Sequence, residues 1–432
     1  MNNFQKNKVL TLLLILIFSS CSYFDEEEDN ILPGKRESLY VSGEDVILKA
    51  NKRIKIDKPI PITSWSQQHQ NERNHLFHFK SKPNLKLKKK IRLGNINLKK
   101  IEYITPPVFF GETIYYSGNE FHVFAKSIET GKLKWKLKLE QEKQENFSLV
   151  GGFFTNGKEL FFSTGLGNIY CVDVNSGKIK WKKEFGVQFS RPPLVKNNMI
   201  FVVSDDNQFF AIDKNTGVTV WNHLGNIEEL SIIGGSKPVI DNNIIVVTYS
   251  SGEIFAFNQN DGSIIWFDNI SSGSFLSKTS INDIQSPLCI EENTIYVPTF
   301  SNKLLAYDLK TGKTKWAINL SSINPLVISG EAMFVMDING RLLSLEKKTG
   351  KLLWAVQLRV EKNKNEIVWS GPLLSTNKLL IVSSDGLVLS LSPFTGKTLS
   401  KMKFEESFLS NPFHVGEDIY LISKQGTLYV LG

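Results

Sequence analysis

The chain has 432 residues, of which 41% are hydrophobic and 11% aromatic, enough to build a large buried core. Its formal net charge is +8, but residues 80–100 hold nine cations and no acid, and the rest of the chain is close to neutral. A charge excess confined to one short segment argues against a protein whose whole body binds nucleic acid.

The first residues, 1–20, have the pattern of a secretory signal peptide. Two lysines precede an apolar run at 9–18, which is shorter than the roughly 20 residues that a membrane-spanning helix needs. Ser19-Ser20-Cys21 follows and resembles a bacterial lipobox, in which cleavage precedes the Cys and the thiol is acylated. By resemblance to bacterial lipoproteins, Ser22 after it favours the outer membrane. We therefore expect a lipid anchor at Cys21 on the periplasmic face; an ordinary signal peptide with an incidental Cys is the alternative.

Two charged segments follow the signal. Residues 21–40 are expected to form a flexible tether, because Asp25–Asp29 is a run of five acids that repel one another and bury no apolar surface. Further along, about 66–100 is expected to be a basic insertion. It is interpreted as a solvated loop, or as a segment attracted to anionic lipid headgroups or to an acidic partner.

A strand–turn–strand unit recurs along most of the chain. In Leu304–Trp316 an alternating strand leads to the turn Thr311-Gly312-Lys313, where Gly supplies the positive φ that closes a short hairpin. Seven such turns occur, and in the seventh unit Ser400 stands four residues after the Gly. Repeats of roughly 40–50 residues made of strands and turns predict propeller blades. The other six units carry a Trp at that position: Trp135, Trp181, Trp221, Trp266, Trp316 and Trp354.

An eighth blade is expected to combine both ends of the chain. Residues 410–431 match the first three strands of a blade, and the stretch 59–66 around Trp65 resembles a fourth strand with its Trp. Joining them would remove the exposed edges of an open array. The prediction is an all-β protein. Residues 41–432 form an eight-bladed β-propeller of four-stranded antiparallel blades, and the N-terminal strand closes the last blade.

No sequence pattern predicts a catalytic or metal site. The six histidines are scattered without metal-binding spacing, and no nucleophile elbow or phosphate-binding Gly loop is found. Asp173, Asp213 and Asp308 recur just before the turn, where Asp commonly binds backbone, so a structural role is expected. Cys171 and Cys289 are expected to be small buried residues rather than a disulfide. We expect no cofactor and no enzyme activity.

Strand order predicts where a partner would bind. In a four-stranded antiparallel blade, the turns between strands one and two and between strands three and four share one face of the ring, and the inter-blade connections lie on the other. The connections at 222–236 and 267–286 are long, irregular and expected to be neighbours. The first presents Leu230, Ile232 and Ile233, an apolar cluster suited to a protein partner. The alternative is that these residues only plug the mouth of the ring.

The repeat carries a resemblance to known families. Its pattern Ala/Ser-x-Asp-x-x-Thr-Gly-Lys-x-x-Trp resembles the PQQ-type propeller repeat of quinoprotein dehydrogenases. With the lipoprotein signal and acidic tether, the chain more closely resembles the family of outer-membrane protein assembly factor BamB. Ser190-Arg191-Pro192, Leu230–Gly234 and the run from Ile284 to Trp354 carry this likeness.

The resemblance implies a non-enzymatic scaffold of the BAM complex that assists the insertion of β-barrels into the outer membrane. Its implied partners are the periplasmic domains of BamA, with unfolded outer-membrane protein clients as further candidates and no nucleic acid. The implied contact residues are Leu230, Ile232, Ile233 and Asp283. Ile233 departs from the family, which usually has Arg there, and Asp283 alone represents an acidic loop.

Two alternatives remain beside this interpretation. One is a PQQ-dependent quinoprotein dehydrogenase-like enzyme. Such enzymes resemble one another in an adjacent Cys pair, a calcium site and a catalytic Asp, and this sequence has no adjacent Cys pair. The other is a propeller lipoprotein that serves as scaffold for a different envelope assembly.

Overall fold

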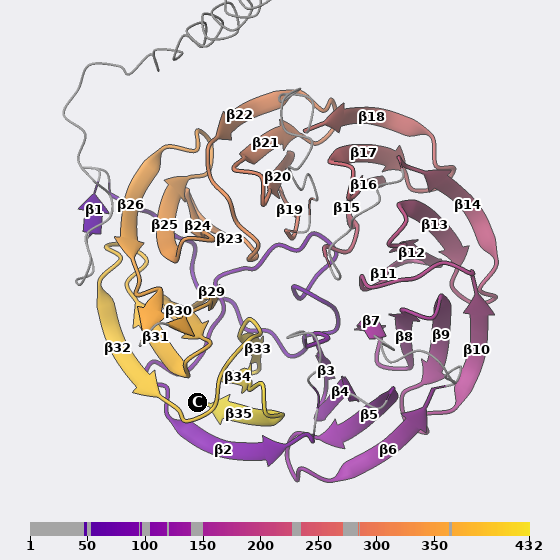
Figure 1. Ribbon diagram of the computed structural model, residues 1–432, viewed down its shortest axis with the longest axis horizontal. Helices are drawn as coiled ribbons and strands as arrows, with labels where there is room; N and C mark the ends of the chain where they lie inside the picture. Colours follow the sequence, from indigo (N-terminus) through magenta and orange to yellow (C-terminus); the bar gives the residue numbers. More distant parts are fainter. Residues whose placement is uncertain are drawn as a thin grey trace, which may run out of the picture. The chain divides into compact units, whose positions relative to one another are not determined.

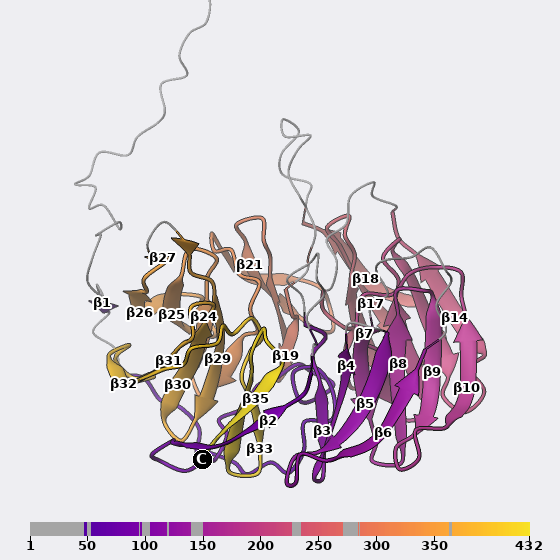
Figure 2. The same cartoon turned by 60° about the horizontal axis from the view of Figure 1, so that its bottom comes forward.

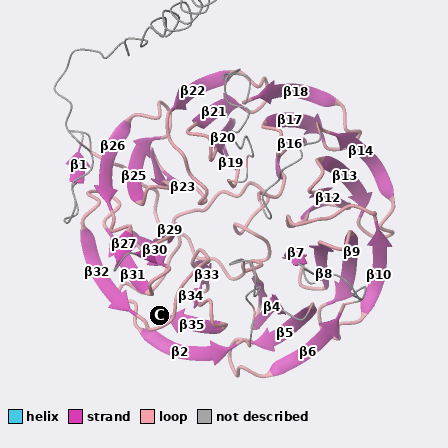
Figure 3. Ribbon diagram, in the orientation of Figure 1, coloured by secondary structure: helices cyan, strands magenta, loops and turns pink. Residues whose placement is uncertain are grey.

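The computed structural model describes residues 47–49, 53–94, 96, 104–118, 121–139, 150–226, 235–270, 284, 286–362 and 365–432. All of them belong to one compact unit, Glu44–Gly432. Their regular structure is strand, and no helix long and apolar enough to cross a membrane occurs among them. Eight four-stranded antiparallel blades stand in a ring (Figures 1 and 3). The predicted all-β, eight-bladed propeller is confirmed.

Each blade runs from an innermost strand beside the ring centre to an outermost strand at the rim (Figure 1). Blades 1 to 4 consist of β3 (Val108–Phe110), β4 (Thr113–Gly118), β5 (His122–Ser127) and β6 (Leu133–Lys138); β7 (Val150–Thr155), β8 (Glu159–Thr164), β9 (Asn168–Asp173) and β10 (Ile179–Glu184); β11 (Leu194–Lys196), β12 (Met199–Val203), β13 (Gln208–Asp213) and β14 (Thr219–Leu224); β15 (Val239–Asp241), β16 (Ile244–Thr248), β17 (Glu253–Asn258) and β18 (Ile264–Asn269).

Blades 5 to 8 follow the same order, with short additions around blade 6. They consist of β19 (Cys289–Glu291), β20 (Thr294–Pro298), β21 (Leu304–Asp308) and β22 (Thr314–Ile318); β23 (Val327–Ser329), β24 (Ala332–Met336), β25 (Arg341–Glu346) and β26 (Leu352–Gln357); β29 (Trp369–Ser375), β30 (Lys378–Ser383), β31 (Leu387–Leu391) and β32 (Thr398–Lys403); β33 (Phe413–Val415), β34 (Asp418–Ile422), β35 (Thr427–Leu431) and β2 (Leu87–Arg92). The additions are β1 (Ile47–Lys49), which pairs with the edge of β26, and the hairpin of β27 (Glu361–Lys362) and β28 (Asn365–Glu366).

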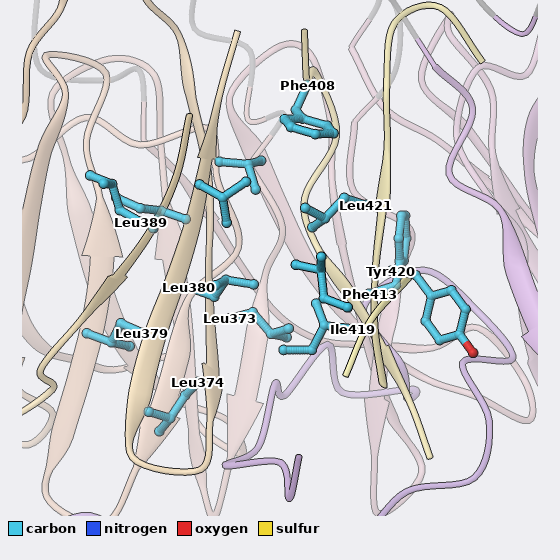
Figure 4. Close-up of a cluster of buried hydrophobic side chains, with 14 of the residues drawn as sticks. Leu373, Leu374, Leu379, Leu380, Leu389, Phe408, Phe413, Ile419, Tyr420 and Leu421 are labelled. Carbon is cyan, nitrogen blue, oxygen red and sulfur yellow. The ribbon is translucent and has the colours of Figure 1, made fainter. Parts of the chain in front are cut away.

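The core lies between the faces of adjacent blades. Middle strands are buried on both faces because each blade packs between two others, whereas the outermost strands expose most of their side chains. Between blades 7 and 8, Leu373 and Leu380 lie beside Ile419 and Leu421 in one apolar cluster (Figure 4). Burial of this apolar surface stabilises the packing of the two blades.

An N-terminal strand closes the last blade, as predicted, but it is β2 rather than the stretch around Trp65. Strand β2 pairs antiparallel with β35 from Leu87 opposite Leu431 to Arg92 opposite Thr427. Part of the expected basic insertion at 66–100 is therefore the closing strand itself. Trp65 does not occupy the repeat position of the other six tryptophans.

The stretch around Trp65 belongs instead to residues 54–81, which we call the central segment. It crosses the middle of the ring and continues to β2 (Figure 1). Trp65 is 3% exposed and packs against the rings of Phe79 and Phe413, at centroid distances of 5.9 and 5.7 Å. Its large apolar surface is thus buried at the ring centre, not at the rim.

The central segment contacts all eight blades. The contacts lie where each innermost strand ends, at the turn between strands one and two, so this face of the ring is spanned by the segment (Figure 2). From blade 1 to blade 8 they are Trp65 with Phe109, Ser66 with Thr155, Glu72 with Lys196, Glu72 with Ile240, Arg73 with Ile290, His75 with Ile328, Phe79 with Thr376 and Ile62 with Gly416.

Adjacent blades are joined at the rim by the repeat tryptophans. Each indole Nε1 donates to a carbonyl in the strand-three-to-four turn of the next blade, for example from Trp266 to the Leu309 oxygen at 2.8 Å. The turn Gly lies against the indole face: a Cβ at Gly312 would stand 2.7 Å from the Trp266 ring. We call each such contact a seam. The other indole donors and acceptors are Trp135 with Val174, Trp181 with Lys214, Trp221 with Gln259, Trp316 with Lys347 and Trp354 with Pro393.

The structural roles expected for the three turn aspartates and for the two buried cysteines are confirmed. The Asp308 carboxylate accepts hydrogen bonds from the backbone N–H groups of Lys310 and Thr311, and Asp173 and Asp213 do the same in their turns. Cys171 and Cys289 are buried free thiols in different blades. Burial raises the pKa of the Cys171 thiol to about 12, so it is not poised as a nucleophile.

Candidate partner-binding surface around blade 4

The two connections expected to bind a partner flank blade 4. The predicted stretches 222–236 and 267–286 cover the ends of β14 and β18 and most of the connections between blades 3 and 4 (225–238) and between blades 4 and 5 (270–288). The predicted contact residues Leu230, Ile232, Ile233 and Asp283 lie outside the described residues, as does Cys21. The described ends of both connections show how they are anchored.

Both connections start beside the same turn, between β16 and β17. The backbone N–H and side-chain amide of Asn226 donate to the Glu253 carboxylate at 2.9 and 2.6 Å. The backbone N–H of Ile270 donates to the Gly252 carbonyl at 3.0 Å. Since Gly252 and Glu253 are consecutive, the starts of the two connections are neighbours, which agrees with the arrangement expected from strand order.

Thr248 of β16 holds the far end of the second connection, and Arg191 lies against the far end of the first. The guanidinium of Arg191, which is almost fully buried, donates to the Thr248 carbonyl at 2.7 Å. The Thr248 hydroxyl donates to the Ile284 carbonyl at 3.3 Å. A Cβ at Gly235 would approach the Arg191 Nε to 3.0 Å, so the absence of a side chain there lets the first connection pass over the arginine. Arg191 is thus a structural support under the surface.

Apolar side chains that sequence reasoning missed extend this surface onto the rim. Leu224 and Phe267 are the residues at which the outermost strands β14 and β18 approach the connections, and they are 59% and 67% exposed. The Phe267 ring stacks on Phe255 at 5.6 Å, and His223 lies 4.6 Å from Phe255. Exposed apolar residues beside a polar loop are typical of protein-binding surfaces. The sequence signal for these residues is the low charge of β14 and β18, which together contain a single acid, Asp268.

The central segment, which lies at the turns between strands one and two, also contacts the end of the connection between blades 3 and 4. Lys237, which lies in this end, is fully buried and donates to the Asn71 carbonyl at 3.0 Å. Burial lowers the pKa of the Lys237 ammonium to about 7, while the neighbouring Glu72 carboxylate acts to raise it. The Asn74 side chain donates to the Ser236 hydroxyl at 3.4 Å. The connection is therefore fixed to the centre of the ring.

The titratable side chains around blade 4 are engaged in hydrogen bonds within the fold. In the part of the chain that the structure describes, no group of three or more His, Cys, Asp and Glu side chains is placed to hold a metal ion. His223 makes a 2.9 Å hydrogen bond between its Nδ1 and the Tyr249 hydroxyl, and burial lowers the pKa of this imidazole. Burial also raises the pKa of the Tyr249 phenol. Both groups are therefore neutral near pH 7.

Comparison with known proteins agrees with this architecture. The model of a family described as outer membrane protein assembly factor BamB matches residues 119–356 and 339–431. Uncharacterised proteins of Rickettsia conorii and Rickettsia prowazekii are 29% and 24% identical over 129 and 228 residues. These matches cover 30% and 52% of this chain, and only 31% and 55% of those relatives.

Solved structures with the same fold include BamB from Moraxella catarrhalis, with a TM-score of 0.66, 20% identity and coverage of 81% of this chain and 99% of that one. A europium-containing methanol dehydrogenase has a TM-score of 0.67, 14% identity and coverage of 86% and 98%. At these identities the likeness concerns the fold alone. An assembly factor and an enzyme are thus built on the same ring.

Proposed function

Because this chain belongs to the family of outer membrane protein assembly factor BamB, we propose that it is a non-enzymatic scaffold of the BAM complex. In this proposal the chain binds the periplasmic domains of BamA and assists the insertion of β-barrel proteins into the outer membrane. A lipid on Cys21 would hold it at the periplasmic face of that membrane. The family match carries the proposal.

The arrangement around blade 4 supports a protein-binding role. Two long connections are anchored by Glu253, Thr248 and Arg191 on a rigid ring, and exposed Leu224 and Phe267 lie beside them. Binding loops on a rigid scaffold lose little conformational freedom on association, which favours affinity. We propose that Leu230, Ile232, Ile233 and Asp283 contact BamA on this surface.

The test is co-purification from envelope extract with a tagged copy. Wild type is expected to recover BamA, and the double variant Leu230→Glu, Ile232→Glu is expected to lose it, because two charges would have to be buried in an apolar contact. The matched control is Val218→Glu, Val220→Glu, which places the same charges on exposed positions at the other end of β14.

The control is expected to recover BamA as wild type does. A folded loop variant that still recovers BamA would move the interface elsewhere. Recovery of a different envelope assembly by wild type would replace the BAM assignment. Replacing Cys21 by Ala should release the protein from the membrane fraction, and unchanged fractionation would contradict the lipid anchor.

A quinoprotein-like enzyme is the second candidate, favoured by the shared ring of the methanol dehydrogenase. The scaffold and the enzyme predict different results in a simple assay, in which purified protein is mixed with pyrroloquinoline quinone, Ca²⁺, an alcohol and an electron-accepting dye. An enzyme of this kind would oxidise the alcohol and reduce the dye. The scaffold proposal predicts no turnover above a heat-denatured control. Turnover that is saturable in the quinone would overturn it.

A further inference from the structure

The seam between blade 8 and blade 1 differs from the six tryptophan seams. In the pairing of β2 with β35, Lys89 stands opposite Val430 just after a β-bulge, which is the position that Trp181 occupies opposite Cys171 in blade 2. The Lys89 ammonium donates to the Glu129 carbonyl in the next blade at 3.0 Å. Lysine thus replaces the indole while keeping a bond to the neighbouring turn. We call this contact the lysine seam.

A groove of about 580 Å³ opens at the lysine seam, because a lysine side chain cannot cover the turn as an indole does. The groove runs between β2 and the turn Glu129–Gly131, and Ile91 forms part of its floor against Gly131. Four cations and one acid, Glu129, line it. The cations are Lys89, Lys90, Arg92 and Lys126.

The three groove lysines contact neutral groups, whereas the Arg92 guanidinium interacts electrostatically with the Glu406 carboxylate. The Lys126 ammonium donates to the Arg92 carbonyl at 2.5 Å, Lys89 binds a carbonyl, and Lys90 lies 5.0 Å from the Tyr429 ring centroid. Some other cations of the described ring are paired with acids, such as Lys88 with Asp418 and Lys180 with Glu159. Among the described residues, none of the four groove cations forms a salt bridge. Their charge is available to an external anion.

The groove lies within a larger basic surface. The outermost strands of three consecutive blades, β2, β6 and β10, carry Lys or Arg at half or more of their positions, and Glu184 is their one acid. They form one arc of the rim (Figure 1). We call this arc the basic rim. The outermost strands of blades 3 to 6 are almost free of charge.

Exposed apolar side chains are interspersed with these cations. Leu87, Leu133 and Ile179 begin the three strands of the basic rim and are 42–52% exposed. On all three strands a lysine also lies over an aromatic ring of the same blade: Lys90 over Tyr429, Lys136 over Phe124 and Lys182 over Tyr170. Cations mixed with apolar side chains on one surface suit the headgroup region of a bilayer, where phosphates and acyl chains meet.

We propose that the basic rim docks on a membrane surface rich in anionic lipids, and that the seam groove receives a lipid phosphate. The four groove cations surround the phosphate, and Leu87 and Leu133 enter the interface beside it. An acidic protein partner would use the cations but would leave the exposed leucines without a role. This contact would set how the ring stands on the membrane, independently of any partner bound at blade 4.

The test measures binding of the full chain, produced without acylation, to vesicles. The vesicles are phosphatidylcholine alone or phosphatidylcholine mixed with phosphatidylglycerol. The variant Lys90→Gln, Arg92→Gln, Lys126→Gln removes three groove cations. The control Lys310→Gln, Lys313→Gln, Lys351→Gln removes three exposed cations from turns of blades 5 and 6. Both variants have the same net charge, and their N-terminal residues are identical.

We expect binding to the anionic vesicles alone, weakening as salt rises. The groove variant is expected to bind about 100-fold more weakly, since each cation near an anionic surface contributes about fivefold. The control is expected to bind as wild type does. If the triple variant does not fold, Lys90→Gln alone should weaken binding about fivefold.

Any of four results would overturn the proposal. The groove variant could bind as tightly as the control, or wild type could bind neutral vesicles equally well. Alternatively, wild type could ignore vesicles and bind soluble polyglutamate through the same cations, which would assign the basic rim to an acidic protein. Full displacement from vesicles by an equal concentration of inorganic phosphate would show a site for a free anion rather than for a membrane.

Discussion

The same position of the outermost strand carries an apolar indole at the six tryptophan seams and a charged ammonium at the lysine seam. At a tryptophan seam, the indole covers the turn Gly of the next blade and donates to its backbone, as Trp354 does with Pro393 at 2.9 Å. At the lysine seam, Lys89 keeps a bond to the turn but leaves a groove lined by cations. One position of the repeat therefore covers the neighbouring turn in six places and lines a cation-rich groove in another.

Trp65 adds a third case to the comparison. It follows strand-like residues as the repeat tryptophans do, yet it lies at the ring centre against Phe79 and Phe413. A Trp is thus buried wherever apolar surface is available, and its place in the ring follows from the path of the chain, not from the residue alone. The following predictions, from the largest expected effect to the smallest, test these distinctions.

Removing a seam indole should cost the most stability. Trp354 is 1% exposed, so Trp354→Ala is expected to lower the free energy of unfolding by about 3–5 kcal/mol. Lys89→Ala is expected to change it by less than about 1 kcal/mol, because the lysine leaves no cavity in the core. Urea denaturation followed by circular dichroism measures both. Equal losses would contradict the distinction between the two kinds of seam.

Acid should destabilise the ring centre rather than the seams. Burial lowers the pKa of His75 in the central segment, and of His414 beside it, from 6.5 to about 4. The unfolded state therefore binds more protons between these values. Stability is fully present above about pH 6.5 and is lost as the pH falls towards about 4, by up to about 3 kcal/mol per histidine.

The measurement is the urea midpoint across this pH range for wild type and His75→Gln. The variant is expected to have a weaker pH dependence, because its side chain does not titrate. Trp354→Ala is the control, since an indole-to-carbonyl bond has no titratable group, and it should shift the whole curve without changing its slope. An unchanged slope in His75→Gln would show that another group causes the acid sensitivity.

Much of the fold could be predicted because its determinants are local. The turn glycines, the aspartates that bind turn backbone and the spacing of the tryptophans are all properties of one repeat. The prediction for the eighth outermost strand is wrong because a Trp is not a sufficient marker of that strand. The better signal is the order of side chains: Leu87–Arg92 repeats the pattern of Leu133–Lys138, with Lys89 in place of Trp135.

The course of the central segment could not be predicted, because each of its contacts joins it to a distant residue, such as Ile62 with Gly416. The residues that anchor the two connections at blade 4 could not be predicted either, because they also act through contacts between distant residues. Strand order places the two connections beside each other, but it says nothing of Thr248 linking Arg191 to Ile284. The roles of Leu230, Ile232, Ile233 and Asp283 remain predictions.

Adding a side chain at a seam glycine should separate backbone strain from crowding. Gly312 and Gly416 have φ values of 69° and 67°, so Ala at either position costs about 1–2 kcal/mol in the left-handed conformation. Only at Gly312 would the Cβ also meet an indole, at 2.7 Å, whereas Gly416 faces open space. Gly312→Ala is therefore expected to be the more destabilising in thermal unfolding. Equal losses would show that the indole moves aside freely.

Converting the lysine seam into a tryptophan seam should have the smallest effect on stability. In Lys89→Trp the indole would cover Gly131, and burial of its apolar surface is expected to raise the free energy of unfolding by about 1 kcal/mol. The same change would fill the groove and weaken binding to anionic vesicles. A variant that is no more stable, yet binds vesicles normally, would contradict the equivalence of Lys89 and the repeat tryptophans.

The central claim is that the surface at blade 4 binds BamA while the basic rim serves another purpose. The most direct measurement is the affinity of the purified periplasmic domains of BamA for three forms of this protein: wild type, Leu230→Glu with Ile232→Glu, and Lys90→Gln with Arg92→Gln and Lys126→Gln. We predict that the loop variant loses binding and that the groove variant binds as wild type does. Loss of binding in the groove variant, with the loop variant unaffected, would contradict the account.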